Sequence, residues 1–342
     1  MKRILALTLA LLTLLTLFVA CNDPENTPDG GETPKKVSAN VWVLNGTTGF
    51  GIAPLIEDAK AGTTALDYKF TVETNAANVQ AALLNGTADI AALPTNAASA
   101  LYNKSKAQST ENAGFVLLAL NTRGVLYLVA NTAKVAAPTS LADLAGKTVY
   151  CPAQNPAFVT KALLDKAQAT NVTLDSATYA EPAALRDAVA SGLVDYAVLP
   201  EPMVTIAISK AKQANAGVTL AAALDLTAEW KTAFGTDSLV QGCIVARKAF
   251  VDAHPEEVKK FLEEYEASIN YVIANPKEAS EKIAASGVFA QAPVAEKAIP
   301  KCNLCFITGA EMKSAMSAFL SALPVASIGG ALPADDFYYT AK

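Results

Sequence analysis

Two stretches of the chain share one order of apolar and polar positions. Residues 79–101 and 185–207 each begin with an amphipathic helical pattern that stops at a glycine, and a short apolar run, IAAL or YAVL, follows. Each run ends in Leu-Pro, and a second helical pattern starts directly after it. Glycine suits the end of a helix, a continuous apolar run is typical of a strand covered on both faces, and proline ends a strand ladder. Both stretches therefore predict a helix, a buried parallel strand and another helix.

A constant offset relates these stretches and the segments before them. The offset is 106 residues, the difference between positions 86 and 192, and it also aligns the loop at 45–51 with that at 151–157. Within residues 79–101 and 185–207 the identical residues other than alanine are Gly86 and Gly192, Asp89 and Asp195, Leu93 and Leu199, and Pro94 and Pro200. Each half of the chain therefore predicts a βαβαβ unit, and the fold class is α/β with two parallel-sheet lobes.

Further apolar runs connect these units. Runs at 115–121 and 124–131 lie between the halves, and a run at 238–250 precedes a long helical pattern. Two β crossings between the lobes predict a two-strand hinge. We therefore expect the first lobe to comprise residues 37–128 and 240–342, and the second lobe to comprise residues 129–239.

The amino-terminal segment has the pattern of an export signal. Lys2 and Arg3 precede an apolar run over residues 4–20, so we expect residues 1–20 to be a signal peptide. Residues 21–36 are rich in proline, glycine and acidic residues and contain few apolar ones. Such a segment cannot bury a core face and predicts a flexible tether.

The sequence LFVAC at the end of the apolar run resembles the lipobox of bacterial lipoproteins, with phenylalanine where that pattern prefers leucine. The resemblance implies cleavage before Cys21, acylation of Cys21, and an extracytoplasmic protein anchored to the bacterial cell membrane by lipid. The alternative is an uncleaved membrane anchor.

Composition narrows the classes of function. The chain has 342 residues, of which 52% are hydrophobic, which suffices for a large core. Its formal net charge of −5 gives no indication of a nucleic-acid partner. The chain has one histidine, so at most one is available to a catalytic triad or to an HExxH zinc site. We therefore expect no catalytic residue, no cofactor and no metal.

Four cysteines follow Cys21. They are Cys151, Cys243, Cys302 and Cys305. The last two have CxxC spacing, but they lie in the β-like run CNLCFIT, whereas a redox motif usually opens a helix. A zinc site would need all four thiols to converge. We therefore expect structural disulfide bonds or buried thiols, with the pairing left open.

The first strand-to-helix loop, residues 46–51, reads GTTGFG. It is not the dinucleotide fingerprint GxGxxG, and it lacks the lysine of a P-loop. In an open α/β sheet, ligands bind at the carboxyl ends of the strands, where we expect this loop and those at 93–96, 151–158 and 199–202. We therefore predict that four loops converge on one cleft between the lobes. The alternative is tight turns without a ligand.

The candidate ligand-binding residues lie in these loops and near the hinge. They are Asn45, Gly46, Thr47, Thr48, Gly49, Phe50, Thr95, Asn96, Asn121, Thr122, Pro152, Gln154, Asn155 and Glu201. Glu201 is the one acidic residue among them and could accept from an amine or a ring N–H. The alternative for Glu201 is a solvated acid at a helix N-terminus. Arg123, near the hinge, is a candidate cation.

Together these features resemble the extracytoplasmic substrate-binding proteins of ABC importers. The segments LNGTTGFGIAPLIEDA, NGTADIAALPTNAASALYN and SGLVDYAVLPEPMVT are similar to the branch related to nitrate, sulfonate, taurine and thiamine-precursor binding proteins. The resemblance implies the type II periplasmic-binding fold, hinge closure on a small solute, and docking to a membrane permease. We expect a monomer.

The scarcity of cations in the loops favours a neutral or amine-bearing organic solute over an inorganic anion. Two alternatives remain: an enzyme on the same fold that acts on a small aromatic carboxylate, as menaquinone-pathway enzymes do, and a lipid-anchored solute sensor. The export signal and the lack of an acid–base pair in the loops favour a binding protein over an enzyme.

Overall fold

The computed structural model describes residues 36–107, 114–214 and 217–340. The predicted signal peptide, Cys21 and the tether up to residue 35 lie outside the described residues. Among the helices described, none is long and apolar enough to span a membrane. Residues 37–342 belong to one unit, so the two halves of the repeat are described together.

One sheet has six strands in the order β11-β4-β10-β3-β1-β2. β1 pairs in parallel with β2 and β3, whereas β10 is antiparallel to β3 and β4, and β11 is antiparallel to β4. The strands are β1 (Ser38–Leu44), β2 (Asp67–Glu73), β3 (Ile90–Pro94), β4 (Phe115–Arg123), β10 (Val240–Arg247) and β11 (Leu304–Ile307).

The other sheet has five strands in the order β7-β6-β8-β5-β9. β6 pairs in parallel with β7 and β8, whereas β5 is antiparallel to β8 and β9. The strands are β5 (Leu126–Asn131), β6 (Thr148–Tyr150), β7 (Thr173–Asp175), β8 (Tyr196–Pro200) and β9 (Leu220–Asp225). β5 thus begins before residue 129, where we placed the start of the second lobe.

The two sheets share the arrangement that the repeat predicts, which confirms the α/β class. Three parallel strands stand as β2-β1-β3 and β7-β6-β8, and one antiparallel strand, β10 or β5, follows. The sheets are therefore mixed and not wholly parallel. The reason is the route of the chain: Leu126 of β5 pairs with Pro200 at the end of β8, and Gly242 of β10 pairs with Pro94 at the end of β3. A strand that enters at the carboxyl edge of its neighbour must run antiparallel to it.

Helices separate the strands as predicted. They are α2 (Thr47–Phe50), α3 (Ala53–Lys60), α4 (Ala76–Asn85), α5 (Thr95–Ala107), α6 (Asn155–Lys166), α7 (Pro182–Ala190), α8 (Met203–Ala214), α9 (Leu226–Phe234), α10 (Lys248–Ala253), α11 (Pro255–Ala274), α12 (Pro276–Ala285), α13 (Ala292–Ala298) and α14 (Gly309–Ser321), with short 3-10 turns at Leu141–Leu144, Ile299–Lys301, Val325–Ile328 and Asp335–Phe337. The predicted glycines Gly86 and Gly192 follow α4 and α7 with φ of 81° and 73°, the left-handed conformation that favours glycine.

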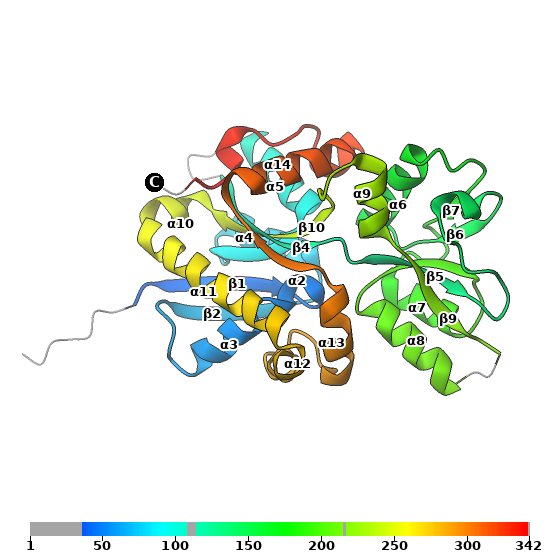
Figure 1. Ribbon diagram of the computed structural model, residues 1–342. Coiled ribbons are helices and arrows are strands. Elements are labelled where there is room, and N and C mark those ends of the chain that lie inside the picture. Colours follow the sequence, from blue (N-terminus) through cyan, green and yellow to red (C-terminus); the bar gives the residue numbers. More distant parts are fainter. Residues whose placement is uncertain (1–35, 108–113, 215–216, 341–342) are drawn as a thin grey trace, which may run out of the picture. The chain divides into compact units, whose positions relative to one another are not determined.

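Helices cover both faces of the first sheet (Figure 1). α4, α5 and α14 pack on one face, and α3, α11 and α12 pack on the other. Successive residues of β4 alternate between these cores: Leu117 belongs to the first and Leu118 to the second. This alternation follows from the two-residue period of a strand. On the second sheet, α7 and α8 cover one face and α6 and α9 cover the other.

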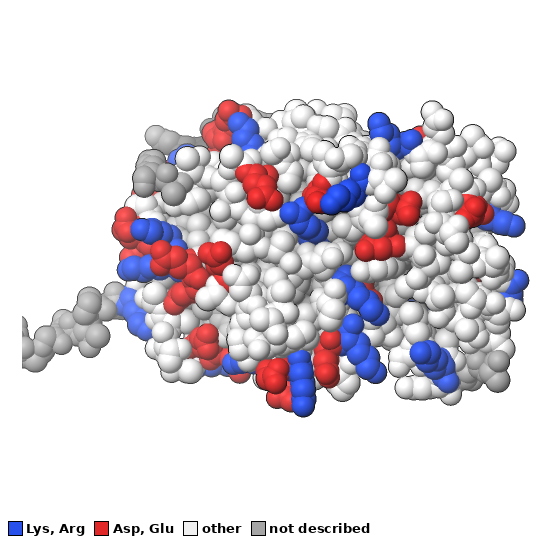
Figure 2. All heavy atoms as spheres, in the orientation of Figure 1, with Lys and Arg blue, Asp and Glu red and all other residues white. Residues whose placement is uncertain are grey.

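The carboxyl-terminal part returns to the first sheet, as predicted. β10 and β11 flank β4, and the N–H of Tyr339 donates to the carbonyl of Leu117 at 3.0 Å. Tyr102 in α5 donates to Asp336, which also pairs with Lys106 at 3.0 Å. On the face in Figure 2, basic side chains are interspersed with acidic ones, in keeping with the small net charge.

Candidate ligand-binding site

The predicted loops lie at the carboxyl ends of parallel strands in both sheets. In the first sheet β1 leads into the loop before α2 and β3 leads into α5, and in the second β6 leads into α6 and β8 leads into α8. The chain also passes between the sheets at this edge, through residues 124–125 and 235–239. We call these segments the first and second crossing. Because both crossings leave from the loop edge, the loop edges of the two sheets face each other.

The glycine loop is held by the protein's own backbone. The N–H of Asn45 donates to the carbonyl of Glu73 at 2.8 Å, and the N–H of Gly46 donates to that of Val288 at 3.2 Å. Asn45 is exposed and Thr47 is partly exposed. Phe50 is 0% exposed and its ring packs on Phe289, so the structure places this ring in the core and not against a ligand.

Asn121 and Thr122 support the glycine loop. The Asn121 amide nitrogen donates to the carbonyl of Thr48 and to the hydroxyl of Tyr265, each at 3.0 Å. Its oxygen accepts from the Thr122 hydroxyl at 3.0 Å. The Thr95 hydroxyl is likewise occupied, because it donates to the carbonyl of Val240 at 2.7 Å. These predicted residues therefore join β4, α11 and the loops to one another.

Asn96 and Asn155 differ from these residues. The side-chain oxygen of each is buried and has no hydrogen-bond partner within the part of the chain that the structure describes. Asn96 is 8% exposed and lies at the start of α5, and Asn155 is the first residue of α6. A buried oxygen without a donor costs about 1–3 kcal/mol, so each of these atoms needs an explanation.

The loop before α6 is strained as well. Gln154 has φ 64° and ψ −126° and is exposed, and Pro152 beside it is buried. A residue with a side chain rarely adopts this conformation, and such strain occurs often at functional sites. The strain and the unpaired Asn155 oxygen thus occur in adjacent residues.

Glu201 is buried and hydrogen-bonded within its own lobe. Its side chain is 0% exposed, so it is not a solvated acid. One carboxylate oxygen accepts from the N–H of Thr205 at 3.1 Å, and the other accepts from the Thr205 hydroxyl at 3.0 Å. The Lys301 ammonium lies 3.8 Å away. Burial raises the pKa of Glu201, and the Thr205 bonds and Lys301 act in the opposite direction. Glu201 is thus a buried cap of α8.

Arg123 lies beside the second crossing. Its guanidinium donates to the carbonyl of Asp237 and lies 3.4 Å from a Glu311 carboxylate oxygen. It lines a cavity of about 250 Å³ with Ser238 and Ser314. None of the predicted ligand-binding residues lines this cavity. The candidate cation is therefore already paired.

The four cysteines after Cys21 are free thiols; three of them are buried, as in the buried-thiol alternative, and Cys305 is partly exposed. Burial raises the pKa of Cys151 and of Cys305 to about 12, because a thiolate is poorly solvated there. Among the described residues no group of three or more metal-ligating side chains gathers.

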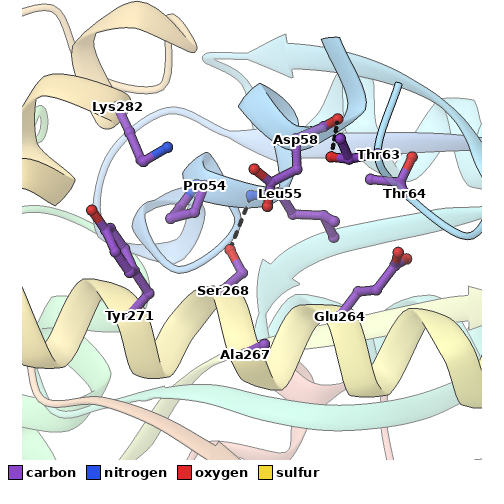
Figure 3. Close-up of a pocket in the computed structure, with 10 residues that line it drawn as sticks. All are labelled: Pro54, Leu55, Asp58, Thr63, Thr64, Glu264, Ala267, Ser268, Tyr271 and Lys282. Atoms are coloured by element: carbon purple, nitrogen blue, oxygen red, sulfur yellow. Dashed lines mark hydrogen bonds between the residues drawn. The ribbon is translucent and has the colours of Figure 1, made fainter. Parts of the chain in front are cut away.

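Another cavity, of about 340 Å³, lies between α3, α11 and α12 (Figure 3). Glu264 and Ser268 of α11 point toward it, and Lys282 lies over the ring of Tyr271 at its other end. Ser268 accepts from the N–H of Leu55 at 3.1 Å. This cavity too is lined by none of the predicted ligand-binding residues.

A family model described as NMT1/THI5-like matches residues 63–279. The chain belongs to the NMT1/THI5-like family. The match starts after the glycine loop and includes the loops that follow β3, β6 and β8. A comparison with curated proteins found no match.

Solved structures share the fold of this NMT1/THI5-like chain. An ABC transporter structure from Parabacteroides distasonis has a TM-score of 0.73 at 24% identity, over 90% of this chain and 100% of that one. For the periplasmic aliphatic sulphonate binding protein of Escherichia coli the TM-score is 0.61 at 13% identity, over 83% and 85%. The periplasmic nitrate-binding protein of Synechocystis has a TM-score of 0.51 at 14% identity, over 74% and 67%. The predicted type II periplasmic-binding fold is thereby confirmed.

Proposed function

We propose that this protein is the extracytoplasmic solute-binding component of an ABC importer. Its two sheets, acting as lobes, close on a small organic solute and present the closed form to a membrane permease. The family, the fold and the proteins that share it support this proposal. Closure is a population shift, because a solute that contacts both lobes binds the closed form better than the open form.

The observation that carries the proposal is the pair of unpaired oxygens at Asn96 and Asn155. Asn96 follows β3 of the first sheet and Asn155 follows β6 of the second. Each lies at the loop edge of its own sheet, and the loop edges face each other across the crossings. A solute bound between the sheets could donate a hydrogen bond to both oxygens, which would offset their desolvation cost.

These atoms also indicate the chemistry of the solute. Two amide oxygens accept hydrogen bonds, so the solute needs N–H or O–H groups at two ends. The cations nearest the loops are occupied, since Arg123 pairs with Glu311 and Lys301 pairs with Glu201. We therefore propose a neutral or amine-bearing organic solute, in contrast to the sulphonate and nitrate named for two proteins of the same fold.

Native mass spectrometry of the freshly purified protein tests this function. We expect a fraction of molecules to carry one small organic compound, which then raises the melting temperature when it is added back to stripped protein. The same compound should be recovered unchanged after prolonged incubation. Its conversion would instead support the alternative of an enzyme on this fold, and its absence, with no stabilising solute in a thermal-shift screen, would contradict the proposal.

We also propose that acylated Cys21 anchors the protein to the membrane and that it acts as a monomer. The lipobox-like residues before Cys21 support the anchor. Cells fed an alkyne-bearing fatty acid should label the wild-type protein, and the Cys21→Ala variant should stay unlabelled. A wild-type protein without label would contradict the anchor.

A further inference from the structure

The segment between α13 and β11 contacts the second sheet directly. The carbonyl of Lys301 accepts from the hydroxyl of Tyr127 in β5 at 2.9 Å, and the Lys301 ammonium lies 3.8 Å from Glu201 after β8. Lys301 is in the part of the chain that builds the first sheet. Helices α13 and α8 also lie against each other here (Figure 1), with Met203 packed against the cores of both sheets.

Asn303, two residues later, is bonded to the first crossing and to the helix that precedes the second. Its side-chain nitrogen donates to the carbonyl of Gly124 at 2.7 Å and to the hydroxyl of Thr227 at 3.3 Å. Its own carbonyl accepts from the N–H of Arg123 at 2.9 Å. Gly124 is in the first crossing, and Thr227 is in α9, the helix before the second crossing. Asn303 has φ 45°, which asparagine tolerates better than most residues.

We propose that residues 301–303 form a clasp that sets the balance between the open and closed forms, with Asn303 as the pivot and Lys301 as the closing contact. This inference rests on the proposed function, because it assumes that the sheets move as lobes. Atoms close to a hinge axis move least, so the bond of Asn303 to the first crossing can persist. Lys301 joins the first lobe to Glu201 and Tyr127 of the second. Both partners lie near the first crossing, where the N–H of Glu201 donates to Val125 at 2.9 Å, so the contact that parts in the proposed opening is the 3.8 Å ion pair of the flexible Lys301 side chain.

The charges of Glu201 and Lys301 predict the direction in which each residue shifts the balance between the open and closed forms. The Glu201 side chain is fully buried in this arrangement, and burying a carboxylate is unfavourable unless it is paired. In the proposed opening the first lobe withdraws from Glu201 and its carboxylate gains water, so its charge favours the open form. Lys301, whose side chain is 46% exposed, offsets that cost only when the clasp is closed. Both are therefore positioning residues that act on the lobes and not on the solute.

A set of four proteins tests the clasp: wild type, Lys301→Met, Glu201→Gln and the double variant. Lys301→Met keeps the length of the side chain but removes its charge. In Lys301→Met we expect the ratio of open to closed form to rise about ten-fold. This effect is larger than that of losing an exposed ion pair and smaller than that of leaving a fully buried carboxylate without its partner. Glu201→Gln should lower this ratio, and the double variant should resemble Glu201→Gln, because no buried charge is then left to compensate.

The ratio can be read from distances between spin labels at Leu84→Cys and Leu193→Cys. Leu84 lies near the end of α4 and Leu193 lies just after α7, and they are 42% and 73% exposed. The native thiols at 151, 243 and 302 are buried, whereas Cys305 is partly exposed. Cys21→Ser and Cys305→Ser are therefore present in every labelled protein, and a labelled protein without the added cysteines gives the background. Labels should also show a broader distance distribution in Asn303→Gly, which keeps the backbone conformation accessible but removes the side-chain bonds.

A Lys301→Met distribution that matches the wild type would overturn the clasp, and so would a double variant as open as Lys301→Met. Circular dichroism confirms that each variant is folded. The measurement uses protein without added solute, so it does not depend on knowing the ligand. Failure of the clasp is therefore distinguishable from failure of the proposed function, which shows as the absence of a bound solute.

Discussion

Replacing Gly49 by alanine should destabilise the protein by about 3 kcal/mol or more, at the upper end of the cost of overpacking. A Cβ at this position would lie 2.4 Å from the carbonyl oxygen of Leu44 and 2.9 Å from a methyl of Val288. The oxygen belongs to the backbone of β1, so the strand or α2 must shift to make room. Because α2 carries the glycine loop, the shift would also displace this loop from Asn121.

Gly46 in the same loop provides the matched control. A Cβ there meets no atom within 4 Å, and its φ is 97°. Gly46→Ala should therefore cost only the strain of this backbone conformation, which with ψ −157° is one that essentially only glycine adopts, about 1–3 kcal/mol. Urea denaturation of the two variants gives the comparison. A loss at Gly49→Ala no larger than that at Gly46→Ala would contradict the prediction.

The parts of the fold that depend on local sequence could be predicted. Gly86 and Gly192 end helices because few other residues accept a left-handed conformation, and the apolar runs before Pro94 and Pro200 are strands covered on both faces. The offset between the copies then determined which loops are equivalent. What the repeat could not reveal is that β5 and β10 enter their sheets antiparallel, because that depends on the route of the chain between the lobes.

The site was harder to predict because its partners are distant in sequence. Asn121 was selected as a ligand residue, yet its amide groups bond Thr48 and Tyr265, and no local pattern indicates those partners. The CxxC spacing drew attention to the two cysteines, whereas Asn303 between them makes the bonds to the first crossing and to α9. An asparagine flanked by two β-like residues carries no signal that it lies near a hinge.

A comparison of adjacent residues, Thr95 and Asn96, should separate structural from ligand-binding roles. Thr95→Ala removes a buried hydroxyl that donates to the carbonyl of Val240. We expect a loss of about 1–2 kcal/mol in the free energy of unfolding, with the bound solute retained. Asn96→Ala removes an oxygen that has no partner among the described residues. Without solute, that variant should be as stable as the wild type or more stable.

The effect on the solute should be the reverse. Asn96→Ala should reduce the co-purified compound in the native mass spectrum at least ten-fold, equivalent to about 1.4 kcal/mol of binding free energy, and should abolish the rise in melting temperature. Asn155→Ala should act in the same way from the second lobe, because its oxygen is also unpaired. If Asn96→Ala instead destabilised the stripped protein as much as Thr95→Ala and kept the compound, Asn96 would be a structural residue. A variant that is more stable than the wild type but no longer binds the solute is the result expected at a binding site, because the polar atoms of such a site stay unsatisfied until the solute binds.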